Sequence, residues 1–355
     1  MSRRQRIRFL GKGIVASLAV VLATLVIIEG LSSIGIFAYE IVFFPNPGLS
    51  SRVHVQHDRD LGWVNIPDLR LPEMYGPGRE FRTNSQSFRS PRDFEPDVPA
   101  GVRRIICSGD SFTLGIGVRG GDTWCSLLSS GPGWESVNMG EAGYGLGQIY
   151  LKFERKAAPL EHNRHVFAFI SDSFRRLLLR RFVAWNKPVV ALRNGELVVD
   201  NLPVRRRLFF MPWLLYNSNT INRLRGVDLG QRVLARLRPR SLSASAATPD
   251  ALAVPMAIFE RVEELNAAKG SRALFVYLPS NPRGVPGEEE RLQDLRTRME
   301  AAGLDYLDLA SEFSELPRDQ REGLFDAEWG HLSAAGNEWV ANRLRQRVVG
   351  PITSR

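Results

Sequence analysis

The feature that most constrains the fold is a regular alternation of strand-like and helix-like segments from residue 103 onward. Apolar runs typical of short buried strands occur at 104–107, 136–139, 166–170, 273–278 and 306–309. Helix-like segments lie between them at 123–128, 148–157, 255–268 and 289–302, and a last one begins near Ser333. Strands that alternate with helices pair in parallel, so this region predicts an α/β fold around a parallel sheet.

The first of these strands leads directly into the tripeptide Gly109-Asp110-Ser111, and the residues after it can start a helix. A serine on a strand-to-helix turn projects at the carboxyl edge of the sheet, beside the free amides of a helix N-terminus. That is the starting geometry of a serine nucleophile. Helix capping is the alternative for the tripeptide taken alone, because Asp110 and Ser111 are both good caps.

A serine nucleophile needs a base, and the base needs a group that orients it. Five histidines are present, and His331 stands out because Asp326 and Glu328 precede it in a loop just before the last helix. Loops at the carboxyl ends of parallel strands converge on one edge, so His331 is expected to meet Ser111 there. Surface solubility is the alternative role for both acids.

Taken together, four blocks of sequence resemble the SGNH/GDSL hydrolase superfamily. The blocks occupy 109–118, 138–148, 167–172 and 331–337, and the resemblance covers roughly 61–341 apart from one hairpin. It implies a flavodoxin-like three-layer α/β/α sandwich with Ser111 as the nucleophile and His331 as the base. It also implies that the backbone of Gly143 helps to hold the oxyanion.

Two positions depart from the pattern of that superfamily. Ser171 stands where the third block has an asparagine that donates to the oxyanion, and a hydroxyl has a shorter reach than an amide. The superfamily has its aspartate three residues before the histidine, whereas this chain has Glu328 there and Asp326 five before. We expect Asp326 to orient His331, since a two-residue extension of the loop keeps the aspartate; Glu328 is the alternative acid.

The N-terminus has the features of a membrane anchor. An apolar run at 14–28 follows a cluster of basic residues, and with 30–39 it is long enough to span a bilayer. Basic residues stay on the cytoplasmic side, so we expect an uncleaved signal anchor in the inner membrane, with the rest of the chain periplasmic or extracellular. A removed signal peptide and a buried core helix are the alternatives.

These patterns divide the chain into three parts: a basic tail and anchor at 1–44, a β-rich lead-in at 45–102, and a hydrolase-like domain at 103–355. An insertion at about 183–248 interrupts the last part and begins with a β-hairpin around Asn194-Gly195. The lead-in looks like the segment that precedes the hydrolase core in membrane-anchored bacterial members, such as the alginate acetylation factors.

Charge and cysteine content limit the partners. The net charge is +9, and the arginines fall in short groups that predict solvated surface, with contact to anionic lipid or polymer as the alternative. No nucleic-acid motif accompanies them, and we expect neither a metal site nor a cofactor.

The chain has two cysteines, Cys107 and Cys125. They lie in apolar settings and are expected to be buried thiols in preference to a disulfide.

The function expected from these features is that of an extracytoplasmic serine esterase that removes O-acyl groups, chiefly acetyl, from a carbohydrate or another ester. One alternative is an O-acetyltransferase of exopolysaccharide biosynthesis, which would work with a membrane-bound acyltransferase partner. The other is a non-catalytic binding protein on the same fold.

Overall fold

The computed structural model describes residues 3–43, 54–157, 159–182, 185–204, 226, 229, 250–283 and 288–349. The chain divides into two compact units, and each is described by itself: Met1–Ser51 with Arg206–Pro239, and Arg52–Arg205 with Arg240–Arg355. Most of the predicted insertion after the hairpin lies outside the described residues, as does the turn predicted at 45–48.

The first unit contains one long helix, α1 (Arg3–Phe43). Its segment Gly11–Gly35 has a mean hydropathy of 2.5 and is long and apolar enough to cross a bilayer. Apolar side chains along this segment are exposed, as a lipid-facing helix requires. The helix continues through Glu29, whose carboxylate accepts a hydrogen bond from the backbone amide of Gly226 at 2.9 Å. The predicted N-terminal apolar helix is therefore present.

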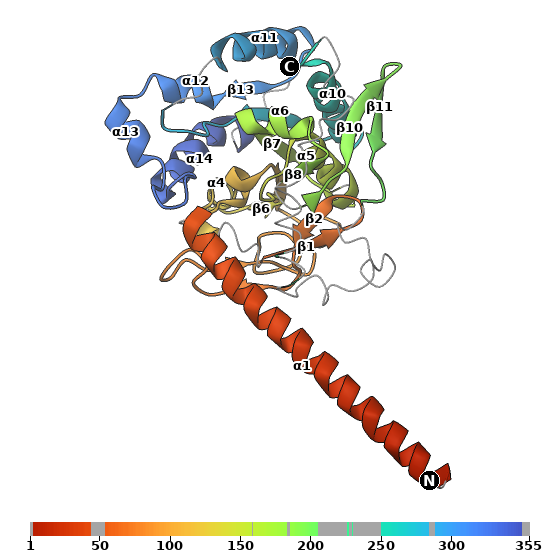
Figure 1. Cartoon of the computed structure of the whole chain (residues 1–355). Coiled ribbons are helices and arrows are strands. Elements are labelled where there is room, and N and C mark those ends of the chain that lie inside the picture. The colour runs from red at the N-terminus through yellow and green to blue at the C-terminus, as the bar shows by residue number, and fades with distance from the viewer. Residues whose placement is uncertain are drawn as a thin grey trace. The chain divides into compact units, whose positions relative to one another are not determined.

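In the described part of the second unit, a five-stranded parallel sheet has the order β13-β12-β7-β5-β6 (Figure 1). Its strands are β5 (Arg103–Ser108), β6 (Trp134–Asn138), β7 (Arg164–Phe169), β12 (Ala273–Tyr277) and β13 (Tyr306–Asp308). Numbered along the chain, the order is 2-1-3-4-5, which is that of doubly wound, flavodoxin-like sheets. The predicted α/β fold with a central parallel sheet is confirmed.

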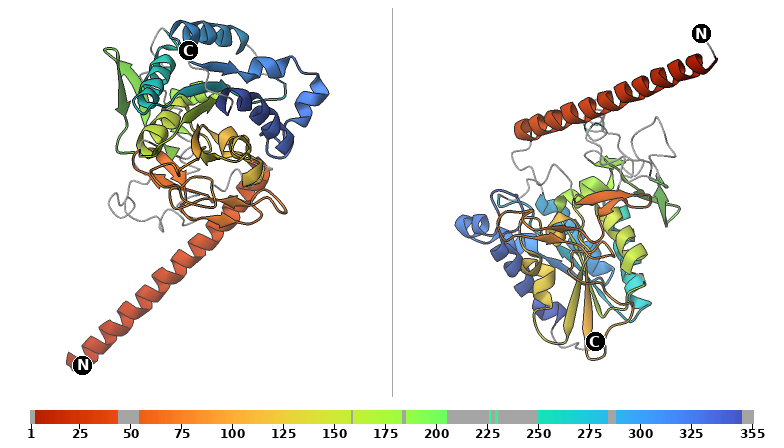
Figure 2. Two further views of the ribbon diagram at one scale, coloured as in Figure 1. Left: turned by 180° about the vertical axis from the view of Figure 1, so that it is seen from behind. Right: turned by 90° about the horizontal axis from the view of Figure 1, so that it is seen from below.

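Helices cover both faces of this sheet. They are α3 (Ser111–Leu114), α4 (Trp124–Leu128), α5 (Leu146–Lys152), α6 (Ser171–Leu177), α10 (Ala253–Ala267), α11 (Glu288–Ala301), α12 (Leu309–Ser314), α13 (Arg318–Gly323) and α14 (Ala334–Val348), with a 3₁₀ turn at Gly120–Asp122 and a π-helical turn at Phe153–Ala157. In Figure 2 helices lie on either side of the sheet. Alternate strand residues enter two separate apolar cores: Phe167 shares one with α5 and α10, while Val166 shares the other with α4 and α14. The middle of the sheet is therefore buried on both faces.

The lead-in forms short antiparallel pairs that pack onto the sheet domain. They are β1 (Val55–Asp58) with β2 (Gly62–Asn65), and β3 (Arg70–Leu71) with β4 (Phe81–Arg82). The Trp63 indole donates to the carbonyl of Ala142 at 2.9 Å, and the Tyr144 hydroxyl donates to the carbonyl of Trp63 at 2.5 Å. The lead-in thus fixes the loop that follows β6.

The predicted hairpin forms from β10 (Val189–Arg193) and β11 (Glu196–Asp200), and the two-residue strands β8 (Arg181–Phe182) and β9 (Trp185–Asn186) precede it. Its turn residues Asn194 and Gly195 have φ values of 52° and 83°. Two positive φ values in a two-residue loop match the twist of the strands and explain the Asn-Gly pair.

Cys107 and Cys125 form a disulfide, so the expectation of two buried thiols is wrong. Both side chains are fully buried, one on β5 and one on α4, and packing brings them face to face. An apolar setting in the sequence predicts a buried cysteine, and free thiols and disulfide-bonded cysteines are both buried. The sequence pattern therefore does not distinguish a thiol from a disulfide. The bond ties the strand before Ser111 to the neighbouring helix.

Loss of this disulfide is expected to lower the free energy of unfolding by about 3 kcal/mol, because it closes a loop of 18 residues. Denaturant unfolding of the Cys107→Ala, Cys125→Ala variant against the oxidised and the reduced wild type measures this. Thiol titration of the unreduced, denatured protein should find no free thiol, since the chain has two cysteines. Two free thiols in that titration would contradict the bond.

Candidate active site

Ser111 is the first residue of α3, directly after β5, and the turn that holds it requires small residues. The Asp110 carboxylate caps the helix by accepting from the amide of Phe112 at 3.0 Å. A Cβ on Gly109 would lie 1.9 Å from the hydroxyl of Thr113, and one on Gly140 would lie 2.1 Å from the amide of Leu114. The glycines therefore allow this strand-to-helix turn (the elbow, residues 109–111) to form against the loop after β6.

His331 meets Ser111 as the sequence predicted. The Nε2 atom of His331 lies 2.9 Å from Oγ of Ser111, and its Nδ1 lies 2.7 Å from the carbonyl oxygen of Trp329. Because a carbonyl can only accept, Nδ1 carries the proton and Nε2 keeps its lone pair for the serine hydroxyl. This is the tautomer that a general base for Ser111 requires.

The surroundings of His331 keep it neutral. Burial lowers the pKa of His331 to about 4, an effect larger than the opposing ones of the Trp329 carbonyl and the Asp326 carboxylate. The ring of Phe112 lies against the imidazole, with 4.7 Å between centroids. At neutral pH the imidazole is therefore ready to accept a proton.

The expected carboxylate is not the group that contacts Nδ1, and this corrects the assignment of Asp326 or Glu328 as the orienting acid. Asp326 Oδ1 accepts from the amides of Glu328 and Trp329 at 2.9 and 3.0 Å, and its Oδ2 lies 3.2 Å from Arg79. Glu328 is largely exposed, 3.9 Å from Arg79. Asp326 thus shapes the turn that aims the Trp329 carbonyl at His331.

Replacing Asp326 with asparagine tests whether the Trp329 carbonyl or the Asp326 carboxylate orients His331. We expect kcat/KM for an ester to fall less than about tenfold, because an amide oxygen can still accept from both turn amides, whereas the same change in a serine–histidine–aspartate triad costs about 10⁴. Glu328→Gln is the matched control and should stay within about twofold. A loss of about 10³ in a folded Asp326→Asn variant would return the orienting role to the carboxylate.

The two residues expected to hold the oxyanion follow the strands on either side of β5. Gly143 lies in the loop after β6 and has a φ of 80°, and a Cβ there would lie 2.7 Å from the ring of Phe182. Ser171 begins α6 after β7, and its hydroxyl accepts from Arg291 Nη2 of α11 at 2.6 Å. Both positions lie at the edge where Ser111 stands, and the bond from Arg291 uses a lone pair of the Ser171 hydroxyl and not its proton.

A buried ionic network lies behind the elbow. Arg176 Nη1 is 3.2 Å from Asp110, and its Nη2 is 3.1 Å from Asp172. The ammonium group of Lys187 donates to the backbone carbonyl of Arg176 at 2.6 Å, and burial lowers the pKa of Lys187 to about 7. Burial also raises the pKa of Asp110, an effect that Arg176 opposes. The network fixes α6 against the residue that caps α3.

Two arginines of the lead-in, to which the sequence patterns assign no role at the site, make contacts around it. Arg79 joins the lead-in to the turn before His331, and it also donates to the carbonyl of Gly117 at 2.9 Å. Buried Arg89 donates to the carbonyls of Leu114, Gly115 and Val118, at the end of α3 and just beyond it. Both arginines lie in irregular segments without periodicity, so only tertiary contact reveals their role.

No protein-family model matches the sequence, and no curated protein matches it. Among solved structures, the chain is similar to a lipolytic protein of the G-D-S-L family from Veillonella parvula (14% identity, covering 68% of this chain and 96% of that one, TM-score 0.38). It is also similar to a lipase/acylhydrolase from Enterococcus faecalis (13%, 70% and 97%, TM-score 0.38). A third is an acetyl xylan esterase (15%, 69% and 99%, TM-score 0.40). At these TM-scores the similarity assigns no activity to the chain.

Proposed function

We propose that this protein is a serine ester hydrolase that removes O-acyl groups, chiefly acetyl, from a carbohydrate or another ester. The observation that carries the proposal is the chain of contacts from Ser111 Oγ to His331 Nε2 and from Nδ1 to the Trp329 carbonyl. A hydroxyl next to a neutral, correctly protonated imidazole is the arrangement that nucleophilic acyl transfer needs.

In the proposed reaction, His331 Nε2 takes the proton of Ser111 as Oγ attacks the ester carbonyl carbon. Negative charge develops on the carbonyl oxygen, and the backbone amides of Ser111 and Gly143 hold it, with Ser171 nearby. The alcohol leaves with the proton from His331, which leaves an acyl group on Ser111. Water, activated by His331 in the same way, then releases the acid and restores the serine.

The same residues serve transfer as well as hydrolysis, because a sugar hydroxyl can replace water in the second step. An O-acetyltransferase with a membrane-bound acyl donor partner therefore stays the second candidate. The location we propose is extracytoplasmic, with α1 as a signal anchor and the N-terminus in the cytoplasm. The Cys107–Cys125 bond supports this location, since disulfides persist in oxidising compartments.

The experiment that tests the proposal is an assay of acetate release from p-nitrophenyl acetate and from an acetylated glycan, with and without added sugar acceptors. Acetate release supports a hydrolase, and acetylation of the acceptor supports a transferase. A folded protein that does neither on any of these substrates would contradict the proposed function.

The pH dependence of kcat/KM follows from the environment of His331. The base must be neutral, and its pKa in the free protein is about 4. We expect kcat/KM to be constant from about pH 5 to neutrality and to fall about tenfold per unit below pH 4. In the Asp326→Asn variant this acidic limb of the pH profile should move to lower pH, because a negative charge that favours the imidazolium is removed. A limb near pH 6.5 would contradict the buried environment of His331.

A further inference from the structure

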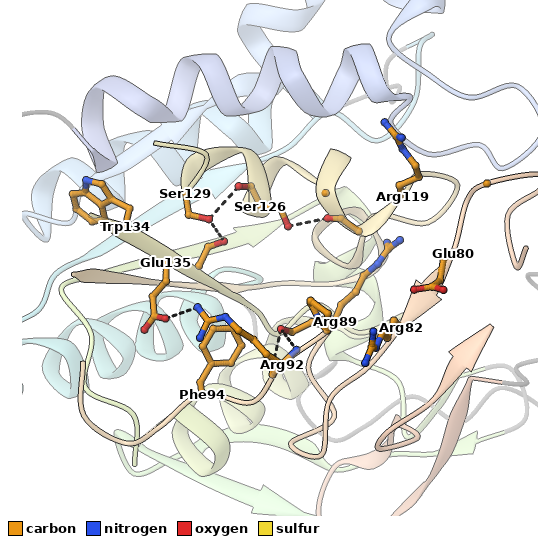
Figure 3. A pocket seen from close by; sticks show the side chains of 16 residues that line it. Glu80, Arg82, Arg89, Arg92, Phe94, Arg119, Ser126, Ser129, Trp134 and Glu135 are labelled. Atoms are coloured by element: carbon orange, nitrogen blue, oxygen red, sulfur yellow. Dashed lines mark hydrogen bonds and ion pairs between the residues drawn. The ribbon is translucent and has the colours of Figure 1, made fainter. Parts of the chain in front are cut away.

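A pocket of about 530 Å³ lies where the lead-in meets α4 and β6 (Figure 3). Neither Ser111 nor His331 lines it. Among the described residues, its walls carry four arginines, two glutamates and four serines. Pockets of this size hold small molecules, and charged and hydroxyl side chains supply most of the residues around this one.

The two glutamates of the pocket are already paired. Glu135 accepts from Arg92 and from Arg104, both at 2.6 Å, and Glu80 accepts from Arg70 at 2.6 Å. Arg104 and Arg70 do not line the pocket. Two of the four arginines are paired as well, Arg92 with Glu135 and Arg119 with Asp122 at 2.7 Å. The arginines of the pocket that make no ion pair with a described residue are Arg82 and Arg89.

Two arginines of the pocket keep donors that no described residue accepts. The side chain of Arg82, on β4, is exposed and has no hydrogen-bond or ion-pair partner among the described residues. Arg89 is 5% exposed; both of its terminal nitrogens donate to backbone carbonyls, but its buried Nε–H has no partner there. Leaving a buried N–H of a charged group unpaired is costly, so the buried charge of Arg89 favours a negative charge nearby.

The serines of the pocket have the opposite character. Ser126 donates its hydroxyl proton to the carbonyl of Gly120 at 2.8 Å, and Ser129 and Ser136 share a hydrogen bond of 2.8 Å. Their protons are committed within the protein, and Ser126 also accepts from the Thr123 hydroxyl at 3.0 Å. The lone pairs that are left can accept from a ligand. This wall suits a ligand that carries hydroxyl groups.

We propose that this pocket is a second binding site, for a small hydroxylated ligand with a carboxylate or phosphate group, such as a sugar acid or a sugar phosphate. Arg82 binds the anionic oxygens, because its guanidinium fork matches both groups, and the buried charge of Arg89 adds to the positive potential there. The serine oxygens accept from the hydroxyls of the ligand. The proposal is independent of the ester chemistry at Ser111.

The test is calorimetric titration of the full chain in detergent at low ionic strength. The probes are glucuronate, glucose 1-phosphate, glucose and inorganic phosphate. The variant Arg82→Gln removes the unpaired charge from an exposed position, and its folding is checked by circular dichroism. Arg318→Gln, which removes an exposed arginine of α13 outside the pocket, is the matched control.

We expect glucuronate, glucose 1-phosphate or both to bind, with glucose weaker, and Arg82→Gln to weaken binding about tenfold or more while Arg318→Gln leaves it unchanged. Whichever probe binds identifies the anionic group. The proposal is overturned if neither acidic sugar binds, if Arg82→Gln binds them unchanged, or if glucose binds equally well. Inorganic phosphate that binds as tightly as glucose 1-phosphate also overturns it, since the serine wall would then contribute nothing.

Discussion

Replacing Ser111 with alanine is expected to lower kcat for p-nitrophenyl acetate by about 10⁴ to 10⁶ and to leave the fold intact. Oγ is the atom that we propose forms the acyl bond, and nothing else in the elbow offers a nucleophile within reach of His331. The side chain is small, and α3 is capped by Asp110 instead of Ser111, so the stability cost should be low. Steady-state kinetics and thermal unfolding of the same preparation measure both effects.

Ser314→Ala is the matched control for that variant. Ser314 ends α12, and its hydroxyl is exposed and donates only to the carbonyl of Ser311. Its kcat should equal that of the wild type. If Ser111→Ala keeps more than about a tenth of the wild-type rate, the covalent mechanism is wrong, and water or another group is the nucleophile.

Replacing His331 with alanine should lower kcat by a similar factor, because serine and histidine act as one unit. The loss should also be partly reversed by added imidazole, which can enter the space left by the ring and take the proton of Ser111. Rates measured with and without imidazole above pH 7 test this. A variant with near wild-type activity would show that His331 only packs against Phe112.

The fold could be predicted from the sequence to a large extent. The strands of the sheet lie within about two residues of the runs at 104–107, 136–139, 166–170, 273–278 and 306–309, because fully buried parallel strands are short apolar runs. The hairpin followed from Asn194-Gly195 for a similarly local reason. The tie between the lead-in and the loop after β6 could not be predicted, since it depends on contacts such as that of Trp63 with Ala142, 79 residues apart.

At the site, the sequence indicated Ser111 and His331 but not the group that orients the histidine. Residue type and spacing identify side chains, and both point to Asp326 or Glu328. The structure places a backbone carbonyl there, which depends on the path of the turn, with Gly330 at a φ of 62°. Which carbonyl faces the ring is a property of that path, and no residue type encodes it directly.

The carbonyl at His331 has a consequence for how such a site would be inherited. Every amino acid carries a carbonyl, so a change of side chain at Trp329 leaves the orienting atom in the chain, whereas a triad loses its acid with one codon change. Loop length is the vulnerable quantity instead. An insertion or deletion between Asp326 and His331 would turn a different carbonyl toward the imidazole, so selection on this site acts on indels more than on substitutions.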